Sequence, residues 1–123
     1  MNTVEKQFND LRYQTGCYYT VERNKQIILY LLKKYGINQV VVSPGATNFA
    51  LVGSMQHDSF FQMFSCVDER AAAYMAIGIA EKSGNPVVLS CTGATASRNY
   101  MAALTYAYKR NLPILVILLM GGI

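Results

Sequence analysis

Short apolar runs alternate along this chain with longer stretches of helical periodicity. Strands are predicted over residues 39–43, 60–67, 87–91 and 113–119, each preceded by a helical pattern or a turn. Strands that are apolar along most of their length are typical of sheets buried on both faces, and strands that alternate with helices build parallel sheets. The pattern therefore predicts an α/β fold, a three-layer doubly wound parallel sheet.

The helical stretches carry their own end signals. They are expected from Glu22, from about Thr47, over 68–83 and over 96–110, with Asp68 as an N-cap and Gly36 as a C-cap. In the third helix, Ala72, Met75 and Ala76 follow at helical spacing. We expect these three side chains to pack in the core.

The chain divides into an N-terminal arm, residues 1–20, and one domain, residues 21–123. The arm is polar and has no clear hydrophobic period, whereas the chain length suits a single core. The domain stops directly after a strand that should lie inside the sheet, with no closing helix. We therefore expect a truncated domain, incomplete at its C-terminus.

Charge and cysteine content argue against several classes of partner. The formal net charge is +4, but the basic residues lie at predicted helix C-termini, where the helix dipole favours cations. No block of like charges is present, so no nucleic-acid partner is expected. The three cysteines have no CxxC spacing and there is one histidine, which predicts neither a disulfide framework nor a metal site.

The sequence also gives no sign of a membrane or secretory segment. The longest apolar run, residues 112–120, is too short to cross a bilayer, and the N-terminus has no apolar signal core. We expect a reduced, soluble protein in the cytoplasm.

Unusual residues follow three of the predicted strands, in segments 43–48, 67–70 and 90–97. Ligands of open α/β sheets gather at the carboxyl ends of the strands. Each segment alone has a plain structural explanation: Pro-Gly is common in turns, and a carboxylate in a helix's first turn offsets the dipole. Neither GxGxxG nor GxxxxGK[ST] occurs, so phosphate binding is not the expected use of these loops.

Order and spacing together are more specific. The succession strand, SPGATN, strand, DERAAAYMAIGIAEKSGNP, strand, SCTGATASRN, helix, LPILVI resembles the pyrimidine-binding (PYR) domain of thiamine-diphosphate-dependent enzymes. Members of that family include acetohydroxyacid synthase and the menaquinone-pathway succinyl-enolpyruvyl-hydroxycyclohexene-carboxylate synthase. The resemblance extends from about Glu22 to Leu119 and implies the thiamine-diphosphate-binding fold.

The resemblance implies roles for individual residues. Glu69 would be the catalytic carboxylate that shares a proton with the aminopyrimidine ring of the cofactor and so activates it. Thr47 and Asn48 would face the substrate. The other cofactor-binding residues would be Ser43, Pro44, Gly45, Thr92, Gly93, Ala94 and Asn99.

The resemblance also implies what lies outside these residues. The family's GDG motif, which holds Mg²⁺ and the diphosphate, does not occur here. We therefore expect thiamine diphosphate to be shared with a diphosphate-binding domain or subunit that holds the Mg²⁺, in a homo-oligomer acting on a small 2-oxo acid. The reaction would be decarboxylation or carboligation.

Two other interpretations remain open. One is a non-catalytic α/β binding or regulatory module with the same fold, and the other is a Rossmann-like nucleotide-binding protein. Such a module has no need of a carboxylate at Glu69, and the nucleotide-binding alternative lacks its glycine fingerprint. Both features favour the enzyme.

Overall fold

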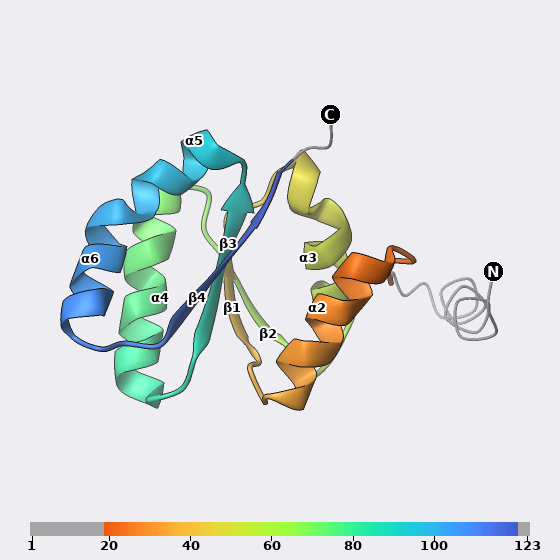
Figure 1. Ribbon diagram of the computed structural model, residues 1–123, viewed down its shortest axis with the longest axis horizontal. Helices are drawn as coiled ribbons and strands as arrows, with labels where there is room; N and C mark the ends of the chain where they lie inside the picture. The colour runs from red at the N-terminus through yellow and green to blue at the C-terminus, as the bar shows by residue number, and fades with distance from the viewer. Residues whose placement is uncertain (1–18, 121–123) are drawn as a thin grey trace.

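The computed structural model describes residues 19–120 as one parallel sheet covered by helices (Figure 1). The strand order is β2-β1-β3-β4, and every neighbouring pair is parallel. The parallel sheet of four strands predicted from the sequence is confirmed. The strands are β1 (Gln39–Val42), β2 (Gln62–Ser65), β3 (Val87–Thr92) and β4 (Ile114–Leu119).

Helices cover both faces of the sheet, which gives the three predicted layers. In Figure 1, α2 (Arg23–Lys34) and α3 (Phe49–Gln56) lie on one side, and α4, α5 and α6 lie on the other. The second group is α4 (Glu69–Ser83), α5 (Ala94–Ser97) and α6 (Met101–Lys109). Short 3-10 turns, η1 (Ala46–Asn48) and η2 (Arg98–Tyr100), precede α3 and α6. Among residues 19–120, no helix has the length and apolar content that a membrane crossing requires.

The core consists of two apolar layers separated by the sheet. Along β3, Leu89 belongs to the layer beneath α4 and α6, and Val88 belongs to the layer beneath α2 and α3. Both side chains are 0% exposed, as expected for a central strand whose alternate residues are buried on opposite faces.

The two outer strands differ from the expectation of complete burial. Three of the four residues of β2 are exposed, and in β4 Leu115 and Leu118 are exposed while the others are half-buried. Within the described residues, these strands each pair on one side only. Burial is therefore nearly complete only in the inner strands β1 and β3, where Gln39 and Thr92 are the half-buried residues.

Both ends of α4 are formed as the sequence predicts. The Asp68 side chain accepts a hydrogen bond from the backbone N–H of Arg70 at 3.0 Å, which confirms Asp68 as the N-cap. At the other end Gly84 adopts a left-handed conformation with φ of 70°. The helix is thus stabilised at both ends by local chemistry.

The expectation that Met75 packs in the core is wrong. Ala72 and Ala76 are 0% exposed, but Met75 is 40% exposed. The buried stripe of α4 continues through Ala73, Ile77 and Ala80, so Met75 lies on its flank. There it lines an open groove of about 370 Å³ beside the outer strand β2.

Two further expectations need revision. The helix expected over 96–110 starts earlier, at Ala94, and is broken into α5, η2 and α6. Most of the predicted arm lies outside the described residues, but its last residue, Thr20, is buried and donates its N–H to Ser54 Oγ at 2.8 Å. Thr20 therefore packs with the domain.

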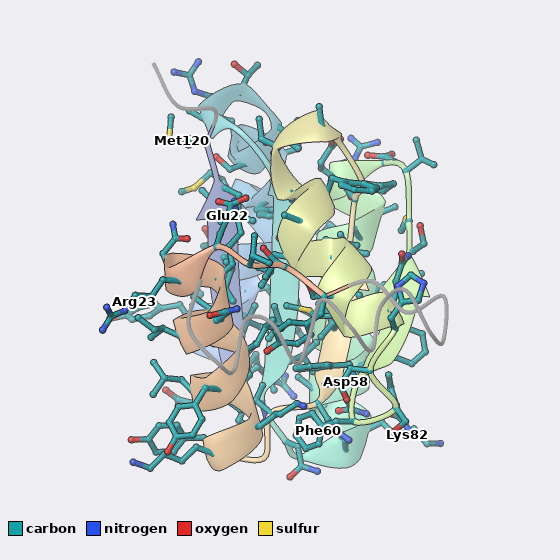
Figure 2. All side chains as sticks on the ribbon, turned by 90° about the vertical axis from the view of Figure 1, so that its right-hand side faces the viewer. Glu22, Arg23, Asp58, Phe60, Lys82 and Met120 are labelled. Atoms are coloured by element: carbon teal, nitrogen blue, oxygen red, sulfur yellow. The ribbon has the colours of Figure 1, made fainter. Side chains whose placement is uncertain are left out.

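Figure 2 distinguishes the two ends of the sheet, the one at the carboxyl termini of the strands and the one at their amino termini. Met120 directly follows β4 and lies at one end of the molecule, whereas Phe60 and Lys82 lie at the other. Phe60 precedes β2 and Lys82 closes α4, so their end holds the strand amino termini. The end marked by Met120 is the carboxyl edge, where the candidate site lies.

Two glycines, Gly78 inside α4 and Gly84 directly after it, should respond in opposite directions to alanine. Gly84→Ala should lower the free energy of unfolding by about 1 kcal/mol, because a Cβ disfavours the left-handed conformation. Gly78→Ala should raise it by about 0.5–1 kcal/mol, because Gly78 is exposed mid-helix and its added Cβ meets nothing within 4 Å. Urea unfolding of the two variants measures both, and equal effects would contradict the assigned end of α4.

Candidate functional site

Parallel register brings three loops to the same edge. Val42 of β1 is the partner of Ser65 in β2 and of Ser90 in β3. The pairing continues one residue further, because Cys66 N–H donates to Val42 O at 3.0 Å and Ser43 N–H donates to Ser90 O at 2.9 Å. Cys66, Ser43 and Cys91 therefore stand at one level across adjacent strands.

Ser43 joins two of these loops. Its side chain is buried, at 2% exposure, and its hydroxyl donates to the Cys66 carbonyl at 2.6 Å. Glu69 follows three residues after Cys66. The Ser43 hydroxyl thus fixes the end of β1 against the segment that leads to the predicted catalytic carboxylate.

Asn48 lies inside its loop and does not face outward. It is 1% exposed; its Oδ1 accepts from Gly45 N–H at 3.0 Å, and its Nδ2 donates to Ser43 O at 3.2 Å. Both ends of the amide therefore hold the backbone of residues 43–48, and the substrate-facing role expected for Asn48 stays a prediction. Thr47 is half-buried, and its hydroxyl has no hydrogen-bond partner within the described chain.

Gly45 marks a close approach between the loops after β1 and β3. A Cβ built at Gly45 would lie 2.3 Å from Thr92 Cγ2, closer than real side-chain carbons come. Gly93 follows with φ of 57°, a conformation that favours glycine. The two loops can pack this tightly because these positions lack side chains.

Glu69 opens α4 as the first helical residue, directly after the Asp68 cap. It is half-buried. Within residues 19–120 its carboxylate makes no hydrogen bond or ion pair, while its charge acts on Cys91 and Tyr100. The carboxylate is therefore available to a ligand, near the buried side chains of Cys91 and Tyr100.

Tyr100 is the site residue that the sequence analysis missed. It is 0% exposed and lies with Cys91 in the core layer beneath α4. Burial raises the pKa of Tyr100 well above its usual range; Cys91 and the charge of Glu69 raise this pKa further, and Ser43 partly opposes them. Burial likewise raises the pKa of the Cys91 thiol, so both groups stay protonated.

The remaining predicted residues lie in the loop after β1, in the loop after β3 and in the helices that follow β3. Pro44 and Ala94 are exposed, and Thr92 and Gly93 are half-buried. Asn99 is exposed, and its Nδ2 donates to Ala96 O at 3.2 Å. Arg98 is exposed and forms no ion pair with any described residue.

The carboxyl ends of the strands thus present one carboxylate, Glu69, without a partner in the described chain, and two glycine-containing loops that approach each other closely. In the described part of the chain, no group of three His, Cys, Asp or Glu side chains could hold a metal ion.

Comparison with known proteins places this arrangement in context. Residues 23–119 match the family model of the thiamine pyrophosphate enzyme N-terminal TPP binding domain. A 2-succinyl-5-enolpyruvyl-6-hydroxy-3-cyclohexene-1-carboxylate synthase from Bacteroides thetaiotaomicron is 36% identical over 99 residues, which are 80% of this chain and 18% of that protein. The synthase of the same name from Enterococcus faecalis is 40% identical over 86 residues, 70% of this chain and 15% of that protein.

Solved structures show the same architecture. Benzoylformate decarboxylase from Polynucleobacter necessarius superposes with a TM-score of 0.70 at 24% identity, covering 77% of this chain and 18% of that one. A putative thiamin diphosphate-dependent enzyme from Mycobacterium smegmatis gives a TM-score of 0.69 at 26% identity, with the same coverage. The chain thus spans less than a fifth of the length of these proteins.

The close contact between Gly45 and Thr92 predicts that a substitution at Thr92 should restore the stability lost by a substitution at Gly45. Gly45→Ala should lower the free energy of unfolding by about 1–3 kcal/mol, because the new methyl group overlaps Thr92 Cγ2. Thr92→Ser removes that carbon, so the double variant should regain most of the loss. Chemical unfolding of the wild type, the two single variants and the double variant tests this prediction. A double variant no more stable than Gly45→Ala would contradict the contact.

Tyr100 predicts a dependence of stability on alkaline pH. Its pKa is raised in the folded protein, so its contribution is fully present below the unfolded value of about 10 and is lost as pH rises toward the folded value. Between pH 9 and 11 the wild type should therefore lose more unfolding free energy than Tyr100→Phe. Equal losses in the two proteins would show that the phenol is not buried as described.

Proposed function

Because this chain belongs to the thiamine pyrophosphate enzyme family, as its N-terminal TPP binding domain, we propose that it supplies the pyrimidine-binding part of a thiamine-diphosphate site. The domain is assigned to residues 21–123. The longer protein would act on a 2-oxo acid.

The half-buried carboxylate of Glu69 carries this proposal. It stands in the first turn of α4, where the Asp68 side chain already caps the helix, and it has no hydrogen bond within residues 19–120. A positioned carboxylate of this kind can hold or move a proton at a ring nitrogen. Glu69 would do so at N1′ of the cofactor's aminopyrimidine.

The loops around Glu69 would bind and orient that ring. Ser43, Pro44 and Gly45 follow β1, and Thr92, Gly93 and Ala94 lie at the end of β3 and directly after it, with Gly45 packed against Thr92. When bound, thiamine diphosphate supplies the carbon nucleophile and electron sink for the reaction. Asn48 would act indirectly, by holding the loop that carries Ser43 and Gly45.

The diphosphate and Mg²⁺ would be held by another domain or subunit. The relatives are much longer than this chain, which covers 15–18% of the two named above. The homo-oligomer expected from the sequence belongs to this proposal, since two domains would then meet over Glu69. A cytoplasmic location is likewise part of it.

Between carboligation and decarboxylation, the relatives favour carboligation. Those at 36–40% identity are named as synthases of 2-succinyl-5-enolpyruvyl-6-hydroxy-3-cyclohexene-1-carboxylate. The decarboxylase at 24% identity shares the fold, and fold alone does not fix a reaction. We therefore propose that the longer protein is a carboligase of the synthase type.

A non-catalytic module with this fold is the alternative, and Glu69 decides between the two. In the longer protein, Glu69→Gln should lower turnover by about two orders of magnitude or more, because it removes the one positioned proton-transfer group. Exchange of the cofactor C2 proton for deuterium, followed by NMR, should slow in parallel.

A matched control lies in the same helix. Glu81→Gln makes the same chemical change at the exposed end of α4, where Glu81 accepts a hydrogen bond from the Tyr106 hydroxyl. It should leave both turnover and exchange unchanged. Wild-type exchange rates in Glu69→Gln, in a protein that still folds, would remove the mechanism.

A further inference from the structure

We propose that the outer strand β2 and the flank of α4 form a docking site for an extended peptide segment that ends in a free carboxylate. The segment would pair with β2, place an apolar side chain against α4 and bring its carboxylate to Lys82. The residues of this site are different from those of the loops around Glu69. The inference therefore does not depend on the proposed function.

The first observation is the free backbone of β2. In the described sheet this strand pairs only with β1, and Gln62 and Cys66 donate their N–H groups to carbonyl oxygens of the β1 segment at 2.8 and 3.0 Å. Successive residues of a strand bond on alternate sides, so the N–H and C=O groups of Met63 and Ser65 point away from β1. Free backbone groups on an outer strand are a template for pairing with another chain.

The second observation is an apolar groove along the same strand. Helix α4 packs over β1 and β3, and within the described residues no side chain of β2 joins that core layer. Phe64 of β2 therefore stays 38% exposed, and with Met75 and Ile79 of α4 it lines the open groove of about 370 Å³. At Gly78 an added Cβ meets nothing within 4 Å, so the helix side of the groove is open. A groove between an outer strand and a helix can take an apolar side chain of an added strand.

The third observation is the polar end of the groove. Its lining residues carry one charge, the Lys82 ammonium, which forms no ion pair with any described residue. The next residue, Ser83, accepts a hydrogen bond from Asn85 N–H at 3.2 Å, which leaves its own hydroxyl proton free to donate. Gln39 adds an amide whose Oε1 is buried and has no hydrogen-bond partner in the described chain. The last residue of a peptide suits this end, because it brings a carboxylate and an N–H donor together.

The positions of these groups determine the direction of the segment. Lys82 lies at the same end of the molecule as Phe60, which precedes β2 (Figure 2). Because β2 runs away from that end, a segment whose last residue lies near Lys82 runs antiparallel to β2. It would then bond to the free groups of Met63 and Ser65. A second copy of β2 is not the expected occupant, because β2 continues into α4 and ends in no carboxylate.

Titration of the longer protein with a short synthetic peptide tests the site. The probe alternates threonine and valine, ends in leucine with a free carboxylate, and is followed by fluorescence anisotropy of an N-terminal label. The same peptide with a C-terminal amide should bind about 10-fold more weakly, because it lacks the charge that Lys82 would pair with. A version with alternate backbone N–H groups methylated should also bind about 10-fold more weakly, because it cannot pair with β2.

Three variants locate the binding on the protein. Lys82→Gln should weaken binding of the acid peptide about 5- to 10-fold and leave the amide peptide unaffected. Lys109→Gln is the matched control, since Lys109 occupies the same place in the last turn of α6 but does not line the groove, and it should bind as wild type does. Gly78→Leu should fill the groove from the exposed side of α4 and abolish binding of both peptides, while circular dichroism shows an unchanged fold.

Octanoate distinguishes a docked strand from a bound small acid. It has a carboxylate and an apolar chain but no backbone, so it should not displace the peptide at equal concentration. Displacement by octanoate, equal affinity of the acid and amide peptides, or wild-type affinity in Gly78→Leu would each overturn the docking site. Absence of binding of the acid peptide to the wild type would overturn it as well.

Discussion

Val40 and Val41 of β1 are wholly buried between β2 and β3, and the parallel register of that central strand determines where the site can form. Because all the strands run the same way, their carboxyl ends stop at one edge, and residues far apart in the sequence meet there. Ser43, Cys66 and Cys91 stand in one row for this reason. A shift of one residue in either pairing would turn Ser43 away from its neighbours on that face.

Beyond the carboxyl ends of the strands, side-chain hydrogen bonds and a close glycine contact hold the loops in place of strand pairing. The Asn48 amide holds the loop after β1 from inside, and Ser43 ties it to the Cys66 carbonyl. Gly45 lets this loop close on Thr92. The carboxylate of Glu69 thus stands beside loops whose shape is set by groups that make no contact with it.

Sequence reasoning located the strands and the ends of α4 because both depend on local signals. The β-branched run 39–43 and the cap pair Asp68 and Gly84 are of this kind. The direction of the Asn48 side chain depends on the 3-10 turn η1. The exposure of Met75 depends on β2 being an outer strand of the described sheet, beside which Met75 lines an open groove. The burial of Tyr100 has a signal in the sequence, because Tyr100, Ala103 and Ala107 follow at helical spacing and are all buried. The signal is weakened because the helix is interrupted at η2, which changes the direction of the side chains before α6.

Asp68 and Glu69 are adjacent carboxylates with separate duties, since one caps α4 and the other is unengaged within the described chain. Replacing Glu69 would cost the helix only its favourable dipole interaction, about 0.3–1 kcal/mol, against a total stability of about 5–15 kcal/mol for a typical domain. Selection for folding therefore hardly acts at this position. A lineage released from the proposed reaction could therefore lose the carboxylate by drift and keep the fold.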